Sequence, residues 1–169
     1  GSSVDTTVND SNTGGANANY YFIGLQATAE GGTITALKIY ARNRNTGGSY
    51  NAFDIAIYKG GTSATNPNGA TLLWNSKDYN GVTIGGNTDA WYAMKDAGGA
   101  DATGEFSQND YLFVVWRSDD GIYLNYKSNT DGWSTNGTRK YAAAGENHGT
   151  SWTTPFVNSG DTALGTMNL

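Results

Sequence analysis

The chain has 169 residues, a length that suits one domain with a substantial core. Charged residues make up only 15% while aromatic residues make up 12%, which excludes a disordered chain, because disorder goes with high charge and few rings. A net charge of −5 without a Lys/Arg cluster disfavours nucleic acid, membrane insertion and polyanionic partners, and the lack of Cys excludes disulfides and cysteine metal sites.

Short β-rich runs recur along the chain, separated by turn residues, and no segment keeps a helical apolar period. Residues 1–19, rich in Asn, Ser, Thr and Gly, are expected to form a flexible or strand-forming arm with room for a short strand at Val4–Val8, and residues 20–169 the domain. The predicted strands are, in chain order, Tyr20–Thr28, Thr33–Arg42, Ala52–Lys59, Thr71–Asp78, Trp91–Met94, Asp110–Ser118, Ile122–Lys127, Arg139–Ala143 and Thr162–Met167.

Turn chemistry separates these runs. Asn68-Gly69, Asn80-Gly81 and Asn136-Gly137 predict hairpins or tight turns, because both residue types tolerate positive φ. Asp119-Asp120-Gly121 is predicted to reverse the chain between the strands on either side of it. Tyr111–Trp116 is apolar at every position, which predicts a central strand covered on both faces.

The order of motifs resembles a known group of modules. The motifs are Gly31–Ala41 (GGTITALKIYA), Asp54–Gly60 (DIAIYKG), Ala70–Ser76 (ATLLWNS), the isolated Trp91 and Gln108–Trp116 (QNDYLFVVW). This pattern is similar to the jelly-roll β-sandwich modules of secreted and cell-surface bacterial proteins, which are often carbohydrate-associated. The resemblance implies an all-β, single-domain antiparallel sandwich of about nine or ten strands, at an extracellular or cell-surface location. The matched residues belong to strands and turns, so no binding residue is carried over.

Catalysis is disfavoured by the placement of the acidic residues. A retaining glycosidase needs two carboxylates about 5–5.5 Å apart across a cleft. Glu30, Glu105 and Glu146 each lie beside Gly in predicted turns, where solvated acids are the simpler interpretation. His148 has no second His or Cys to form a zinc site or a triad with, and is interpreted as a surface residue. We therefore expect a non-catalytic protein that requires no cofactor.

The sequence is compatible with a structural calcium ion, because oxygen ligands suffice for calcium and these loops are rich in them. Asp10–Gly14 spaces two oxygen side chains before a glycine, and Asp119-Asp120 is a second acidic pair. Ordinary turns stabilised by Asp and Asn side chains explain both segments equally well.

A sugar site needs partly exposed rings beside hydrogen-bonding groups, because the C–H face of a pyranose stacks on a flat ring. Trp133 and Trp152 lie in polar, Gly-rich surroundings, as an exposed platform would, although each could instead cap the end of a sandwich. Trp74 and Trp91 are predicted to be core residues, whereas the sequence does not decide whether Trp116 is buried or exposed.

Further candidate ligand-binding residues lie around the acidic turn. Tyr123 and Asn125 could add a ring and an amide, and Arg117, Asp119 and Asp120 could bind hydroxyl groups. The first hypothesis is a module that attaches a larger secreted protein to polysaccharide by ring stacking. The alternative is a structural or adhesive domain of a surface layer, filament or virus particle, assembling by β-strand pairing through the N-terminal arm.

Overall fold

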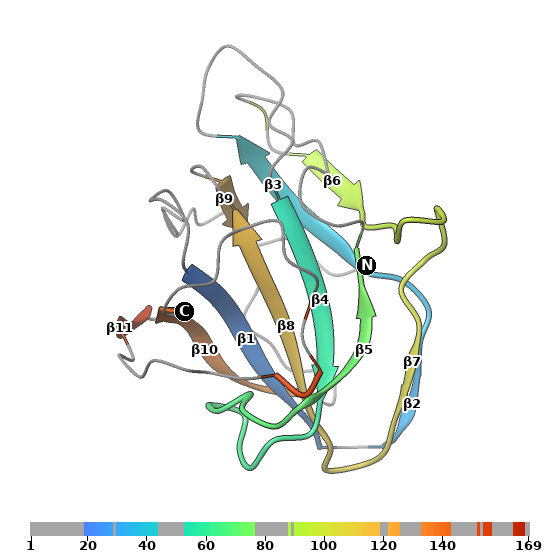
Figure 1. Ribbon diagram of the computed structural model, residues 1–169, viewed down its shortest axis with the longest axis vertical. Helices are drawn as coiled ribbons and strands as arrows, with labels where there is room; N and C mark the ends of the chain where they lie inside the picture. Colours follow the sequence, from blue (N-terminus) through green and yellow to red (C-terminus); the bar gives the residue numbers. More distant parts are fainter. Residues whose placement is uncertain are drawn as a thin grey trace.

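The computed structural model describes residues 19–28, 30–43, 53–76, 88, 90–118, 122–125, 133–142, 152, 154–156 and 164–167. These residues form an all-β fold (Figure 1), and every strand pair among them is antiparallel, which confirms the predicted fold class at this level. The strands are β1 (Asn19–Ala27), β2 (Gly32–Ile34), β3 (Lys38–Asn43), β4 (Phe53–Lys59), β5 (Thr71–Asn75), β6 (Ala90–Ala93), β7 (Gly104–Phe106), β8 (Tyr111–Ser118), β9 (Ile122–Asn125), β10 (Trp133–Ala142) and β11 (Leu164–Met167).

One predicted strand is two strands in the structure. The run Thr33–Arg42 divides into β2 and β3, because the chain leaves one sheet and enters another between Ile34 and Lys38. β2 pairs with β7, whereas β3 pairs with β6 and β9. β7 was not predicted, since three residues with a leading Gly carry no periodic signal.

The Asn136-Gly137 pair lies inside β10 instead of forming the predicted turn. The β1–β10 register runs from Ile23↔Thr138 to Leu25↔Thr135, so two residues of β10 face Gly24 alone. This is a β-bulge, in which one strand carries an extra residue and bends. Pairing along β1 therefore lets β10 continue through a dipeptide that would end an isolated strand. Asn68-Gly69 does form a turn, with φ +81 at Gly69, and Asn80-Gly81 lies outside the described residues.

The largest sheet has six strands in the order β11-β10-β1-β8-β4-β5. β8 lies between β1 and β4, and its residues alternate between two hydrophobic clusters on opposite faces of the sheet. Trp116 belongs to the first cluster, whereas Phe113 and Val115 belong to the second. The continuous apolar run of this strand thus reflects burial on both faces, as the sequence predicted.

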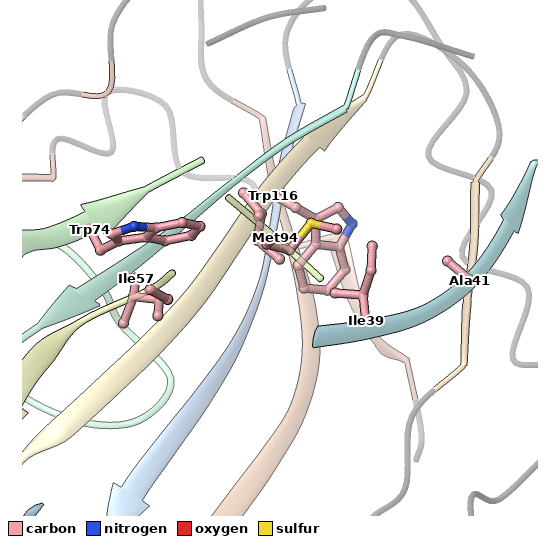
Figure 2. Close-up of a cluster of buried hydrophobic side chains, with 8 residues drawn as sticks. Ile39, Ala41, Ile57, Trp74, Met94 and Trp116 are labelled. Atoms are coloured by element: carbon pink, nitrogen blue, oxygen red, sulfur yellow. The ribbon is translucent and has the colours of Figure 1, made fainter. Parts of the chain in front are cut away.

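The first cluster contains residues of both the six-stranded sheet and a three-stranded sheet of order β6-β3-β9. Ile55 and Ile57 of β4 and Trp116 of β8 contribute from one side. Ile39 and Ala41 of β3 contribute from the other, and Figure 2 shows Ile39 and Met94 beside the indole of Trp116. These contacts fix which face of the three-stranded sheet points inward.

The second cluster is closed by the segment that contains Trp152 and Phe156. The ring of Phe156 packs on Tyr58 of β4 with a centroid distance of 5.1 Å. The Phe156 backbone N–H donates to Ala70 O at 2.7 Å, and its carbonyl accepts from Gly69 N at 2.9 Å. We call residues 152 and 154–156 the strap, since these bonds and rings hold them over the six-stranded sheet.

Candidate binding face

The outer face of the three-stranded sheet is defined by strand alternation. In β3, Ile39 and Ala41 are buried in the first cluster, so Lys38, Tyr40 and Arg42 occupy the opposite face. In β6, Tyr92 packs against the cluster while Trp91 is exposed. We call this outer face the ring face; its positions on the three strands are Lys38, Tyr40, Arg42, Trp91, Ala93, Tyr123 and Asn125.

Trp91 and Tyr40 form a ring pair on the ring face. They are register partners on neighbouring strands, and their ring centroids lie 5.2 Å apart at an interplanar angle of 48°. Trp91 is 56% exposed, the one large hydrophobic residue in the described part of the chain with such exposure. Neither side chain hydrogen-bonds to a described residue, which leaves the indole N–H and the phenol O–H available to solvent or to a ligand. Cross-strand aromatic pairs stabilise a sheet and restrict the motion of both rings.

β9 extends the ring face on the other side of β3. Asn125 is the register partner of Tyr40, and Tyr123 is the register partner of Arg42. Residues directly opposite each other in an antiparallel pair share a face. The backbone therefore places Trp91, Tyr40 and Asn125 in one row across the sheet, with the Tyr123 position in the next row.

The prediction that Trp91 is a core residue is wrong. Tyr92 and Met94 are the residues that face inward around β6, so alternation places Trp91 outside. β6 is also an edge strand of its sheet, which limits how much of the ring neighbouring strands can cover. The alternation of Trp91, Tyr92, Ala93 and Met94 could have revealed this, because only one of the two alternating sets of side chains can face the core.

The other predicted platforms are not on the ring face. Trp152 is only 7% exposed and packs in the second cluster, with its ring centroid 6.3 Å from that of Tyr58. It is therefore buried rather than exposed as a platform would be. Trp133 is the first residue of β10, in register with Ala27 of the six-stranded sheet. Trp74 is buried as predicted, and Trp116, which the sequence left open, is buried as well.

Arg117 lies on β8 in the six-stranded sheet, and its register partner is Asp54 of β4. Asp54 is fully buried. The backbone therefore places Arg117 in a different sheet from the ring face. Asp119 and Asp120 lie outside the described residues.

The predicted reversal at Asp119-Asp120-Gly121 does not join paired strands. β8 pairs with β1 and β4, whereas β9 pairs with β3 in the other sheet. The chain therefore crosses from one sheet to the other between these strands, and this crossing brings Tyr123 and Asn125 to the ring face. The sequence pattern of β9 predicted a strand but not the sheet to which the strand belongs.

Acidic groups do not gather in the described part of the chain. Glu30 and Glu105 are both exposed, and Glu105 lies in strand β7 and not in the predicted turn. Asp101 pairs with Lys95 at 2.7 Å and Asp110 with Lys59 at 3.8 Å. Among the described residues no three His, Cys, Asp or Glu converge as metal ligands. Calcium at Asp10–Gly14 or at Asp119-Asp120 stays a prediction, since both segments lie outside these residues.

Comparison of the chain with protein-family models, with characterised proteins and with solved structures finds no match. Within the described ranges, no helix has the length and apolar character needed to span a membrane.

Proposed function

We propose that the chain is a non-catalytic carbohydrate-binding module that attaches a larger secreted protein to polysaccharide outside the cell. The observation that carries this proposal is the ring pair of Trp91 and Tyr40, with Trp91 56% exposed. Exposing a large indole to water is unfavourable unless a partner covers it, and a sugar ring is a suitable partner. The proposed fold is a jelly-roll-like β-sandwich, supported by the first cluster, to which both the six-stranded and the three-stranded sheets contribute.

Binding would begin with stacking of a pyranose C–H face on Trp91. Tyr40 supports the indole from the neighbouring strand and offers a phenol hydroxyl. The Asn125 position continues the same row and supplies an amide, which can both donate to and accept from sugar hydroxyls. A flat face of this kind desolvates little of its ligand, so the affinity per site should be weak.

The test is calorimetry or affinity electrophoresis of the full chain against a panel of polysaccharides. Trp91→Ala should reduce affinity by about 5- to 150-fold, since loss of a stacking ring is worth about 1–3 kcal/mol for comparable flat ligands. Trp91→Tyr should retain most of the affinity, because a ring remains. Trp133→Ala is the matched control on the other sheet, and a loss of binding there instead would move the site away from the ring face.

The alternative, an adhesive or structural domain that assembles by strand pairing, is favoured by one observation. β6 is an edge strand of the three-stranded sheet and carries the exposed Trp91. An exposed apolar edge strand can pair with a strand of another chain. Light scattering at high concentration separates the two functions, because a monodisperse monomer contradicts self-assembly.

A further inference from the structure

The two rings of the ring face are held close together by the hydrogen-bonding pattern of their strands. Met94 N donates to Leu37 O at 2.9 Å, and these two residues continue the β3–β6 register by one position. Hydrogen-bonded and non-hydrogen-bonded pairs alternate along an antiparallel ladder, so Tyr40 and Trp91 form a non-hydrogen-bonded pair. Side chains are closer in such pairs, which accounts for the 5.2 Å between the ring centroids.

The same alternation sets the next step of the row. The backbone groups of Tyr40 point away from β6, so Tyr40 and its partner Asn125 on β9 form a hydrogen-bonded pair. Cα atoms lie about 4.5 Å apart in non-hydrogen-bonded pairs and about 5.5 Å apart in hydrogen-bonded pairs. The row of Trp91, Tyr40 and Asn125 therefore spans roughly 10 Å across the strands, a length that suits a short stretch of an extended glycan chain.

Along the strands, the row is bordered by residues that do not continue it. On β6, the next residue on the same face as Trp91 is Ala93, which is exposed and offers only a methyl group. On β3, Arg42 is half-buried, its Nε is buried and it already has an interaction partner within the protein. The two rings and the amide position thus lie in a line across the strands and not along them.

The rings of the pair are not coplanar. The planes of Tyr40 and Trp91 are inclined to each other by 48°. Neighbouring strands of a sheet are rotated by roughly 20–25°, which turns successive positions of a row further out of a common plane. A rigid flat surface can therefore stack on only one of the two rings, whereas a single chain can rotate about its glycosidic bonds and contact both rings in turn.

We propose, on the basis of the carbohydrate-binding function above, that the ring face takes a single glycan chain that runs across the strands, from Trp91 over Tyr40 to the Asn125 position. The ligand class is soluble or amorphous polysaccharide, whose chains are separate, and not the packed flat face of a crystalline polysaccharide. Trp91 stacks on one sugar, Tyr40 contacts the next, and the amide at the Asn125 position bonds to hydroxyl groups further along the chain.

The first experiment offers sugars in two physical states. Calorimetry of the full chain measures affinity for soluble xylan, soluble mannan, and cello- and chito-oligosaccharides of increasing length. Depletion of the protein from solution measures affinity for powders of crystalline cellulose and crystalline chitin. We expect the soluble chains to bind roughly fivefold or more tightly than the powders, because a flat surface loses the stacking on one of the two rings. Affinity for the oligosaccharides should rise with length and level off once the row is filled.

Two variants on the ring face test the direction of the chain. Asn125→Ala changes the row and should reduce affinity for the soluble chain about two- to tenfold, the usual effect of one lost hydrogen bond. Ala93→Gln is the matched control beside Trp91 along β6, and it should leave the affinity within about twofold. A loss in Ala93→Gln that equals or exceeds the loss in Asn125→Ala would overturn the proposed direction across the strands.

The outcomes separate this inference from the function on which it rests. A crystalline powder that binds as tightly as the soluble chain of the same sugar, or more tightly, would overturn the single-chain ligand and leave the carbohydrate-binding function intact. If no glycan binds in either state, or if Trp91→Ala leaves the affinity unchanged, the carbohydrate-binding function fails with the inference.

Discussion

Gly24 lies where β1 meets the backbone of the segment after β4. A Cβ built on Gly24 would stand 1.7 Å from the carbonyl oxygen of Ala64 and 2.6 Å from its carbon. Both atoms are backbone, so no side-chain rotation can relieve the overlap. The same residue faces the bulge of β10, which means that two constraints meet at one position.

We predict that Gly24→Ala destabilises the fold by about 1–3 kcal/mol or more, because overpacking forces the backbone to move. Chemical denaturation followed by tryptophan fluorescence measures the change. Gly69→Ala is the control, because a Cβ built on Gly69 would have no atom within 4 Å. The φ of +81 at this residue is unfavourable for Ala, so the substitution should lower the free energy of unfolding by about 1 kcal/mol. If Gly24→Ala is as stable as Gly69→Ala, or more stable, the close contact between residue 24 and the backbone of Ala64 is contradicted.

Two tryptophans show what local sequence could and could not predict. Trp152 has polar neighbours in sequence, and it is buried by packing against residues far away along the chain, Tyr58 among them. Trp91 has apolar neighbours in sequence and is nevertheless exposed, because it lies on the outer face of β6 and β6 is an edge strand. Polarity of the adjacent residues was thus a poor guide, whereas alternation within the strand held the correct signal for Trp91.

At the scale of elements, the strap covers the second cluster on one face of the six-stranded sheet. Trp152 and Phe156 place two rings around Tyr58, and the Thr154 hydroxyl accepts from Leu72 N at 3.3 Å. Burying one large apolar side chain stabilises a fold by about 1.5–3 kcal/mol. The strap therefore serves stability and lies on a different face from the candidate site.

This separation predicts opposite effects for two tryptophan substitutions. Trp152→Ala should lower the free energy of unfolding by about 3–5 kcal/mol through the cavity it leaves, without changing the glycan affinity of the protein that remains folded. Trp91→Ala should change stability by less than about 1 kcal/mol and abolish most of the binding. Thermal unfolding and calorimetry on the same preparations measure both quantities. Loss of binding in a folded Trp152 variant would connect the strap to the site.

Strands with strong patterns were predictable and strands with weak patterns were not. The alternation in Asp54–Tyr58 is that of a strand with two buried faces, and each face joins a different cluster: Ile55 and Ile57 the first, Ala56 and Tyr58 the second. β7 escaped prediction because its pairing with β2 is formed between distant segments. The bulge at Asn136-Gly137 escaped for the same reason, since only the partner strand distinguishes a bulge from a turn.

At the scale of the whole molecule, the assignment of strands to sheets decides the candidate site. β8 and β9 are consecutive in sequence, and a hairpin between them was the simplest expectation. Their separation into two sheets places Tyr123 and Asn125 beside β3, and leaves Arg117 opposite Asp54. The predicted group of ligand residues thus divides between two sheets, and sequence could not show this because pairing depends on contacts that no local pattern encodes.

The same topology predicts an order of amide protection in hydrogen exchange. β8 is bonded on both sides, to β1 and β4, and its faces are buried in two clusters, so its amides should exchange only through global unfolding. β6 is bonded on one side and exposes Trp91, so its outer amides should exchange orders of magnitude sooner. Exchange followed by mass spectrometry or NMR at two protein concentrations measures this order. Protection of β6 equal to that of β8, and rising with concentration, would mean that a second copy covers this edge, which is the outcome expected of an adhesive domain and not of a monomeric binding module.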